Sequence, residues 1–445
     1  MDLGQLATAL ADCVGKLPGL VAGPVTIENL TRLSGGASRE TWAFDAVGAD
    51  GSRAELVLRR DPPGRPGEPG AMGREARAIS AARAAGLAVP EVLARTDAPD
   101  LWGSAGMITR RVAGETIARR ILRDDAYRRA RHVLVGQLGE FAAGLHALPP
   151  LAGLSDPDPV ADLRAILAGF EQVSEVFELA LRTLEADRPP AREPVTVHGD
   201  LRLGNLIVGP AALRAVIDWE LVHAGNPAED LGWLCVKAWR FGVDAPAAGL
   251  GSREELLAAY RAAGGADIGL DELRWWEILG TLRWGVICMT QAWAHLSGAY
   301  RSVELAAIGR RVCEQEWDLL LLLAPEAAAQ AAARRPRPSG APSPDPAPHG
   351  RPTASELLDA VRGYLTDQVM PGTSGQLAFH ARVAANVLGI VARELEFGPI
   401  PAAPRPGATL AGSDLAGLAD HVAAKLAVAN PRYFQTTPSD REAGS

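Results

Sequence analysis

Lysine is scarce in this chain of 445 residues. Only Lys16, Lys237 and Lys425 occur among 45 basic residues, and the others are arginines. The formal net charge is −8, whereas nucleic acids and anionic membranes select proteins with a basic surface. We therefore expect no nucleic-acid partner, and we draw little from any single arginine.

Cysteine and long apolar runs are also scarce. Four scattered cysteines form neither a disulfide framework nor a C-x-x-C pair, namely Cys13, Cys235, Cys288 and Cys313. The acidic N-terminus does not resemble a secretory signal. Charged residues or proline interrupt the most apolar stretches, around 275–293 and 319–333. We expect a cytoplasmic protein without stable membrane insertion.

The length and composition predict a folded protein of two or three domains, since hydrophobic residues make up 47% and charged residues 22%. A Pro-rich run at 333–352 reads as a linker. Beyond it, three stretches with helical periodicity predict a small helical domain at 353–445 of unknown role and unknown protein partner. Upstream, we expect one lobe at 1–113 and a second at 114–332.

The upstream lobes differ in their predicted secondary structure. Residues 25–60 alternate like three strands, 73–87 predict a helix, and 89–94 and 106–112 predict two further strands. After Gly114 the chain is mainly helical, apart from one hairpin built from 195–200, 206–210 and 215–220. The predicted fold class is α+β, with a small antiparallel sheet lobe, a mainly helical lobe and an all-helical C-terminal domain.

Three polar residues on that hairpin suggest phosphoryl transfer. Asp200 ends a strand in His198-Gly199-Asp200, Asn205 follows five residues later, and Asp218 lies in Ile-Asp-Trp-Glu. This chemistry needs a carboxylate to accept the hydroxyl proton and hard oxygen ligands for Mg²⁺. Asp200 suits the first role, and Asn205 and Asp218 suit the second. The alternative is a turn with a capping aspartate.

These motifs resemble the aminoglycoside phosphotransferase and choline kinase-like family, which has the two-lobed protein-kinase-like fold. The resemblance covers about residues 25–320. It implies that Asp200 is the catalytic residue, that Asn205 and Asp218 bind metal, and that His198 and Asp230 brace the catalytic loop. It also implies ATP and Mg²⁺ as cofactors, with GTP left open as the donor.

The N-terminal lobe contains candidates for the nucleotide site. A glycine-containing loop between two strands has the flexibility to cradle phosphates, although such a loop is also an ordinary turn; its residues are Ser34, Gly35, Gly36, Ala37 and Ser38. Glu75 resembles the glutamate that pairs with the phosphate-binding lysine, the alternative being an exposed helical glutamate. We expect Arg110 and Val112 to form the hinge against the adenine.

Three residues near the catalytic motifs are weaker candidates. Arg202 lies inside the loop and suits neutralisation of the transferred phosphoryl group; its alternative role is an ion pair with a nearby carboxylate. Glu220 and His223 follow Asp218, and we expect them to face the acceptor, unless they only occupy a loop.

Arg59 stands where the family usually has lysine, and the two side chains are not equivalent. The run Val57-Leu58-Arg59 with its Pro-Pro-Gly turn resembles a branch that includes kinase-like domains fused to acyl-CoA dehydrogenases. That branch implies a hydroxylated metabolite, such as a hydroxyacyl-CoA, as acceptor. An inactive nucleotide-binding or regulatory module is the alternative. An aminoglycoside substrate is disfavoured because the helical region 118–131 is rich in arginine.

Overall fold

The computed structural model describes residues 2–33, 39–64, 67–99, 101–171, 173–334, 352–400, 402–404 and 412–434. The contacts between residues divide the chain into two compact units. Unit 1 comprises residues 1–157 and 190–276, and unit 2 comprises residues 158–189 and 277–445. Of the predicted linker, 335–351 lies outside the described residues. Within the described ranges, no helix has both the length and the apolar character needed to cross a membrane.

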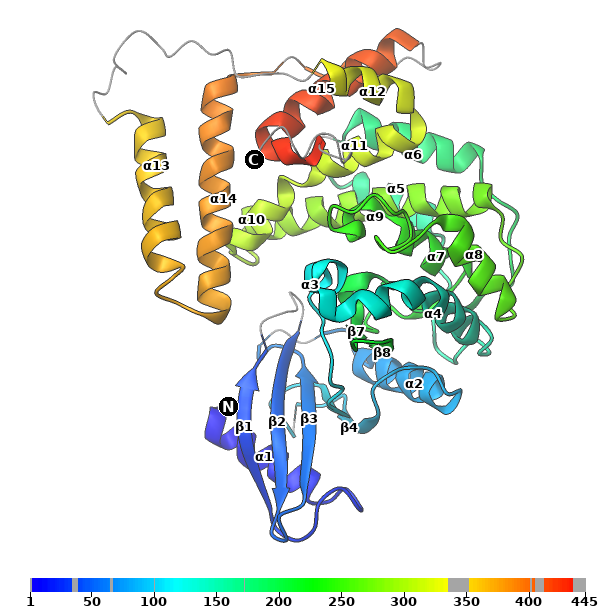
Figure 1. The fold of residues 1–445 in the computed structure, drawn as a ribbon, viewed down its shortest axis with the longest axis vertical. Helices are drawn as coiled ribbons and strands as arrows, with labels where there is room; N and C mark the ends of the chain where they lie inside the picture. Colours follow the sequence, from blue (N-terminus) through cyan, green and yellow to red (C-terminus); the bar gives the residue numbers. More distant parts are fainter. Residues whose placement is uncertain are drawn as a thin grey trace. The chain divides into compact units, whose positions relative to one another are not determined.

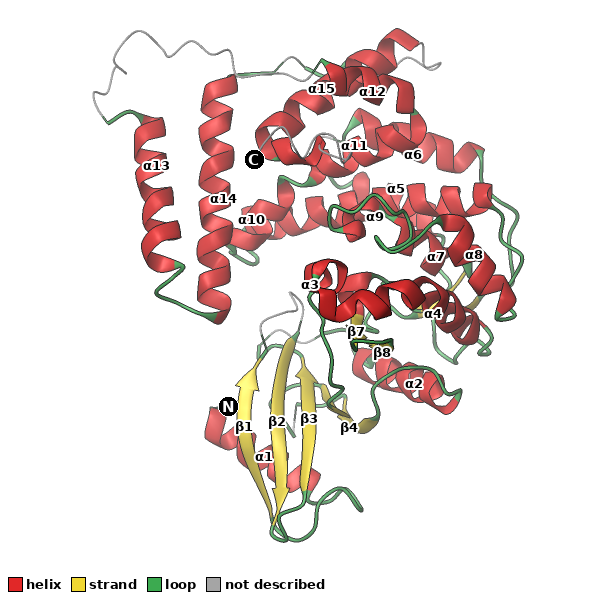
Figure 2. Ribbon diagram, viewed as in Figure 1, coloured by secondary structure: helices red, strands yellow, loops and turns green. Residues whose placement is uncertain are grey.

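Unit 1 contains a five-stranded antiparallel sheet in the order β1-β2-β3-β5-β4 (Figures 1 and 2). The strands are β1 (Val25–Arg32), β2 (Glu40–Gly48), β3 (Arg53–Arg60), β4 (Val92–Thr96) and β5 (Gly106–Arg110). β2 and β3 pair from Glu40 with Arg60 to Val47 with Arg53. The predicted five strands are therefore present, together with the predicted helix, α2 (Ala71–Ala84).

One face of this sheet is covered by a helix that the sequence analysis did not predict, α1 (Leu3–Val14). Its N-terminus is a capping box: the Asp2 carboxylate accepts from the Gln5 N–H at 2.8 Å, and the Gln5 side chain accepts from the Asp2 N–H at 2.9 Å. Buried side chains of α1 share one core with Leu56 and Leu58 of β3. Because side chains alternate along a strand, Arg59 points to the opposite face.

The rest of unit 1 is largely helical and carries two small two-stranded sheets. Its helices are α3 (Ala118–Arg123), α4 (Arg128–His146), α7 (Ala228–Cys235), α8 (Arg253–Ala262) and the start of α9 (Leu270–Leu296). β6 (Val195–Val197) pairs with β9 (His223–Gly225), and β7 (Leu206–Val208) pairs with β8 (Leu213–Val216). The single hairpin predicted from the sequence is thus two ribbons, because β6 pairs with a strand that comes after Asp218.

The secondary structure elements in the described part of unit 2 are all helices. Its helices are α5 (Pro159–Leu167), α6 (Glu175–Ala186), the rest of α9, α10 (Val303–Gly309), α11 (Val312–Leu323), α12 (Pro325–Ala333), α13 (Ala354–Tyr364), α14 (Gly375–Phe397) and α15 (Gly412–Ala429), with a π-helical turn at Leu365–Val369. α15 packs against α11 and α12, so the C-terminal helices share a unit with helices from before the linker.

Candidate active site

The loop that carries Asp200 begins with a turn at Gly199. Gly199 has a φ of +77°, and a Cβ atom at this position would lie 2.4 Å from the carbonyl oxygen of Leu221. Glycine alone meets both conditions without strain. After the turn, a 3₁₀ segment at Leu203–Asn205 brings Asn205 back toward Asp200.

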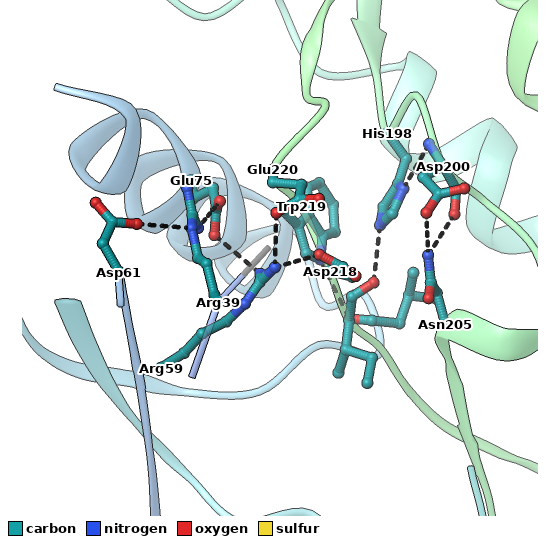
Figure 3. A network of polar contacts seen from close by, with 12 residues as sticks. Arg39, Arg59, Asp61, Glu75, His198, Asp200, Asn205, Asp218, Trp219 and Glu220 are labelled. Atoms are coloured by element: carbon teal, nitrogen blue, oxygen red, sulfur yellow. Dashed lines mark hydrogen bonds and ion pairs between the residues drawn. The ribbon is translucent and has the colours of Figure 1, made fainter. Parts of the chain in front are cut away.

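Asn205 holds Asp200 with its amide nitrogen. Its Nδ2 donates to Oδ2 of Asp200 at 2.6 Å and to the Asp200 carbonyl oxygen at 2.9 Å (Figure 3). Both partners are acceptors, so this side of the amide must be the nitrogen. Within the described part of the chain, the amide oxygen of Asn205 makes no hydrogen bond, and such an oxygen is a suitable ligand for Mg²⁺.

Asp218 is tied to this loop through its neighbour Ile217. The Ile217 N–H donates to the Asn205 carbonyl oxygen at 2.9 Å, and the Ile217 carbonyl oxygen lies 3.1 Å from Nε2 of His198. Asp218 itself has a φ of +69°, a conformation that costs a non-glycine residue roughly 1–2 kcal/mol and that clusters at functional sites. Burial acts to raise the pKa of Asp218, but the positive charges of Arg59, His198 and Arg202 and the hydrogen bond from Arg59 together outweigh it, and the pKa is lowered. Asp218 therefore stays ionised.

Arg59 links three carboxylates. One terminal nitrogen of Arg59 lies 3.1 Å from Oε2 of Glu75, and the other contacts Asp218 and lies 3.1 Å from Oε2 of Glu220 (Figure 3). Glu75 has only 1% of its surface exposed, which rules out the alternative of an exposed helical glutamate. Glu220, expected to face an acceptor, is turned toward Arg59.

A second arginine, Arg39, was not predicted from the sequence. It contacts Oε1 of Glu75, the oxygen that Arg59 does not use, and its Nε lies 3.1 Å from Oδ1 of Asp61. Burial raises the pKa of Glu75, although Arg59 and Arg39 oppose this effect. The only available signal was the place of Arg39, directly after the glycine-containing loop.

Asp230 of α7 braces the loop that carries Asp200. Its Oδ2 and Oδ1 accept from the backbone N–H groups of His198 at 2.8 Å and Gly199 at 2.9 Å. Oδ2 also lies 3.2 Å from Nε2 of His146, whose other ring nitrogen lies 2.9 Å from the Tyr260 hydroxyl. Burial acts to raise the pKa of Asp230, but the hydrogen bond with His146 and the other contacts outweigh it, and the pKa is lowered.

Comparison with known proteins identifies the family of this chain. A model described as "Phosphotransferase enzyme family" (APH) matches residues 29–276, more than half of the chain. The chain belongs to this phosphotransferase family. A second model, described as "Domain of unknown function (DUF6285)", matches residues 371–415.

Curated relatives of this chain include two much longer proteins. Acyl-CoA dehydrogenase family member 11 of Gallus gallus is 28% identical over 249 residues, covering 52% of this chain and 30% of that protein. Acyl-CoA dehydrogenase family member 10 of Mus musculus is 39% identical over 62 residues, covering 14% of this chain and 6% of that protein. The chain thus spans less than a third of either relative, and the predicted resemblance to this branch is confirmed at the level of sequence.

Solved structures show that the fold is shared with other phosphotransferases. A putative aminoglycoside phosphotransferase from Ralstonia eutropha has a TM-score of 0.56 at 20% identity, covering 71% of this chain and 97% of that chain. Spectinomycin phosphotransferase in complex with ADP and spectinomycin has a TM-score of 0.50 at 12% identity, covering 70% of this chain and 98% of that chain. The predicted kinase-like fold is therefore confirmed.

The structure also shows the contacts of the remaining candidate site residues. Nε of Arg202 donates to Oδ1 of Asp200 at 2.9 Å, which is the ion pair given as its alternative role. Nε of Arg110 donates to Oε2 of Glu91 at 2.6 Å. His223 places Nε2 3.1 Å from Glu229.

Two further nucleotide-site candidates belong to the N-terminal lobe. Val112 is half-buried after β5. The glycine-containing loop, Ser34 to Ser38, lies outside the described residues, so its predicted contact with phosphates stays a prediction.

The donor groups fit a hard cation. Within the described ranges, no three His, Cys, Asp or Glu side chains form a metal cluster, but Mg²⁺ characteristically takes only one or two carboxylates from the protein and completes its shell with phosphates and water. Arg39 and Arg59 contact the carboxylates of Asp61, Glu75, Asp218 and Glu220, so four carboxylates face two guanidinium groups in this ion-pair network (Figure 3). Their formal sum of −2 matches one divalent cation.

Proposed function

We propose that this phosphotransferase transfers the γ-phosphate of ATP to a hydroxyl group of a small metabolite. The observation that supports this most directly is the pairing of Asp200 with Asn205, in a loop that Ile217 connects to the ionised Asp218. A carboxylate held in one orientation, an amide oxygen on the residue that holds it and a second carboxylate connected to the same loop form the set of groups that phosphoryl transfer requires.

Each residue has a distinct role in this proposal. Asp200 orients the acceptor hydroxyl and accepts its proton as the new O–P bond forms and the bond from the γ-phosphorus to the leaving ADP oxygen breaks. Arg59 provides positive charge for the phosphates. Asn205 and Asp218 would hold Mg²⁺, which supplies charge neutralisation for the phosphates.

For the acceptor, we propose a hydroxyacyl-CoA. The support is the similarity to acyl-CoA dehydrogenase family members 10 and 11, proteins whose names point to acyl-CoA chemistry. Substrate choice belongs to the site rather than to the fold, so the acceptor has to be tested directly. The same holds for ATP against GTP as the donor.

The test is transfer of labelled γ-phosphate from Mg-ATP to 3-hydroxybutyryl-CoA. Free 3-hydroxybutyrate, choline and kanamycin serve as competing acceptors, and Mg-GTP as the competing donor. We expect a labelled acyl-CoA product that the Asp200→Asn variant makes about 10²- to 10⁴-fold more slowly, the contribution of a positioned base.

Three results would change the proposal. Equal rates for the wild type and Asp200→Asn would refute the role of Asp200. Product from choline or kanamycin alone would replace the acceptor class and keep the phosphotransferase. Tight binding of Mg-ATP with no transfer to any acceptor would favour the inactive nucleotide-binding module.

A further inference from the structure

The indole of Trp233 touches the catalytic carboxylate. Trp233 lies on α7, three residues after Asp230, so one turn of this helix presents both side chains on the same face. Its Nε1 donates to Oδ1 of Asp200 at 2.7 Å, and the residue is 3% exposed. One helical turn therefore supports the catalytic loop twice, at its backbone through Asp230 and at its carboxylate through Trp233.

The two oxygens of Asp200 differ in how many hydrogen bonds they accept. Oδ1 accepts from Nε1 of Trp233 and from Nε of Arg202, while Oδ2 accepts from Nδ2 of Asn205. A carboxylate oxygen has two lone pairs. Among the described residues, Oδ1 is therefore fully engaged, and Oδ2 keeps one lone pair for a further donor.

Both donors to Oδ1 are held against one ring. The rings of Trp233 and Trp239 lie 5.3 Å apart between centroids, and the guanidinium carbon of Arg202 lies 4.8 Å from the centroid of Trp239. Packed aromatic and cation–π contacts of this kind fix the direction of a donor. Oδ1 is thus bound by two donors that have little freedom to leave it.

We infer that Trp233 is a positioning residue for Asp200, and that Oδ2 is the oxygen that takes the proton of the acceptor hydroxyl. This inference rests on the proposed function. By engaging Oδ1, Trp233 and Arg202 fix the plane of the carboxylate and direct the remaining lone pair of Oδ2 toward the acceptor. Trp233 does not itself contact the reacting atoms.

The kinetic test compares Trp233→Phe with a matched control. Phenylalanine keeps an aromatic ring and removes only the N–H donor and part of the ring. Trp102 is also fully buried in unit 1, and its indole N–H has no partner among the described residues. Trp102→Phe therefore makes the same chemical change away from Asp200.

With Mg-ATP and 3-hydroxybutyryl-CoA, we expect Trp233→Phe to lower kcat about 10- to 100-fold, the effect of losing one hydrogen bond to a charged group. KM for ATP should change less than about threefold, since a lost positioning contact acts on the chemical step. Trp102→Phe should keep the wild-type kcat.

A second readout does not need activity. In protein labelled with ¹⁵N at tryptophan, the indole resonance of Trp233 is the one missing from Trp233→Phe. We expect it to shift in Asp200→Asn, because an amide is a weaker acceptor than a carboxylate, while the Trp102 resonance stays in place.

The outcomes are separable. A wild-type protein no faster than Asp200→Asn would overturn the proposed function and the inference with it. Three results would overturn the inference alone. They are a rate that depends on Asp200 but not on Trp233, a loss of kcat in Trp102→Phe equal to that in Trp233→Phe, and a Trp233 indole resonance that Asp200→Asn does not shift.

Discussion

Replacement of Arg59 by lysine separates the charge of this residue from its shape. In the structure, one terminal nitrogen of Arg59 contacts Glu75 and the other contacts Asp218 and Glu220. Lysine keeps the positive charge, but its three N–H donors share one nitrogen and cannot reproduce the two separate nitrogens of the guanidinium fork. Arg59→Lys therefore loses at least one of the two sets of contacts.

The expected cost follows from these contacts. A hydrogen bond to a charged group contributes about 1.5–3 kcal/mol. The side chains of Arg59, Asp218 and Glu220 are 18–28% exposed, so solvent screening places the loss near the lower end. We expect Arg59→Lys to lower the free energy of unfolding by about 1–1.5 kcal/mol and to keep the affinity for Mg-ATP within about tenfold of the wild type.

Arg59→Met completes the experiment because it removes the charge as well. Its affinity for Mg-ATP should fall about 10- to 100-fold by the same arithmetic. Urea unfolding measures the stability of each variant, and titration calorimetry measures nucleotide binding. Wild-type affinity in Arg59→Met would refute the phosphate-binding role, and unchanged stability in Arg59→Lys would show that the forked geometry contributes nothing.

Two further predictions concern buried carboxylates. Asp230→Asn should lower the free energy of unfolding by about 2–4 kcal/mol, because the charged acceptor of two backbone N–H groups is lost. The pKa of Asp230 is lowered from 3.8. In urea titrations, the stability difference between the wild type and Asp230→Asn should therefore stay constant from pH 7 to 5 and shrink only below pH 3.8, toward the pKa of the folded state. A stability difference that already shrinks above pH 5 would contradict a lowered pKa of Asp230. Lys425→Met should lower the free energy of unfolding by about 2–4 kcal/mol, because Glu316 is 2% exposed and pairs with Lys425 at 2.7 Å. Adding Glu316→Gln to the same chain should restore part of this free energy. Additive losses of the two substitutions in thermal or urea unfolding would show that the ion pair does not contribute to stability.

The arrangement of the Asp200 loop was easier to predict because its contacts are local. Asp200, Asn205 and Asp218 lie within 19 residues, and short backbone and side-chain contacts connect Asn205 to Asp200 and to Ile217, the neighbour of Asp218. Their spacing along the chain is therefore enough to indicate the site. The strand pairing was harder, since β6 pairs with His223–Gly225, a segment of three residues without a clear alternating pattern.

Arg39 and Trp233 were not predictable in the same way. Each makes its decisive contact with a residue more than 30 positions away, Arg39 with Glu75 and Trp233 with Asp200. In a chain rich in arginine, no local pattern separates a buried guanidinium from a solvated one. Only the fold brings these pairs together.

The contacts of the C-terminal helices were also not predictable from local sequence, because their partners lie far away in the chain. Acidic side chains are mostly exposed in proteins, yet Glu314, Glu316 and Asp318 of α11 are all buried. Their partners come from the chain end more than 100 residues later: Asn430 with Glu314, Lys425 with Glu316, and the Tyr433 hydroxyl with Asp318 at 2.7 Å. The predicted domain limits at 333–352 and 353–445 stay predictions, but these contacts give α15 and the short segment that follows it a structural role within unit 2.

Arginine at position 59 suits the acidic groups around it better than lysine would. Arg39 already occupies Oε1 of Glu75, so only Oε2 remains for residue 59. A single ammonium group that satisfied this oxygen could not also reach Asp218 and Glu220, whereas the fork of Arg59 reaches all three. The network still has a formal charge of −2 with both arginines in place, so the substitution does not remove the need for a divalent cation. The exchange of lysine for arginine is therefore consistent with an active phosphotransferase in which two guanidinium groups share the glutamate of α2.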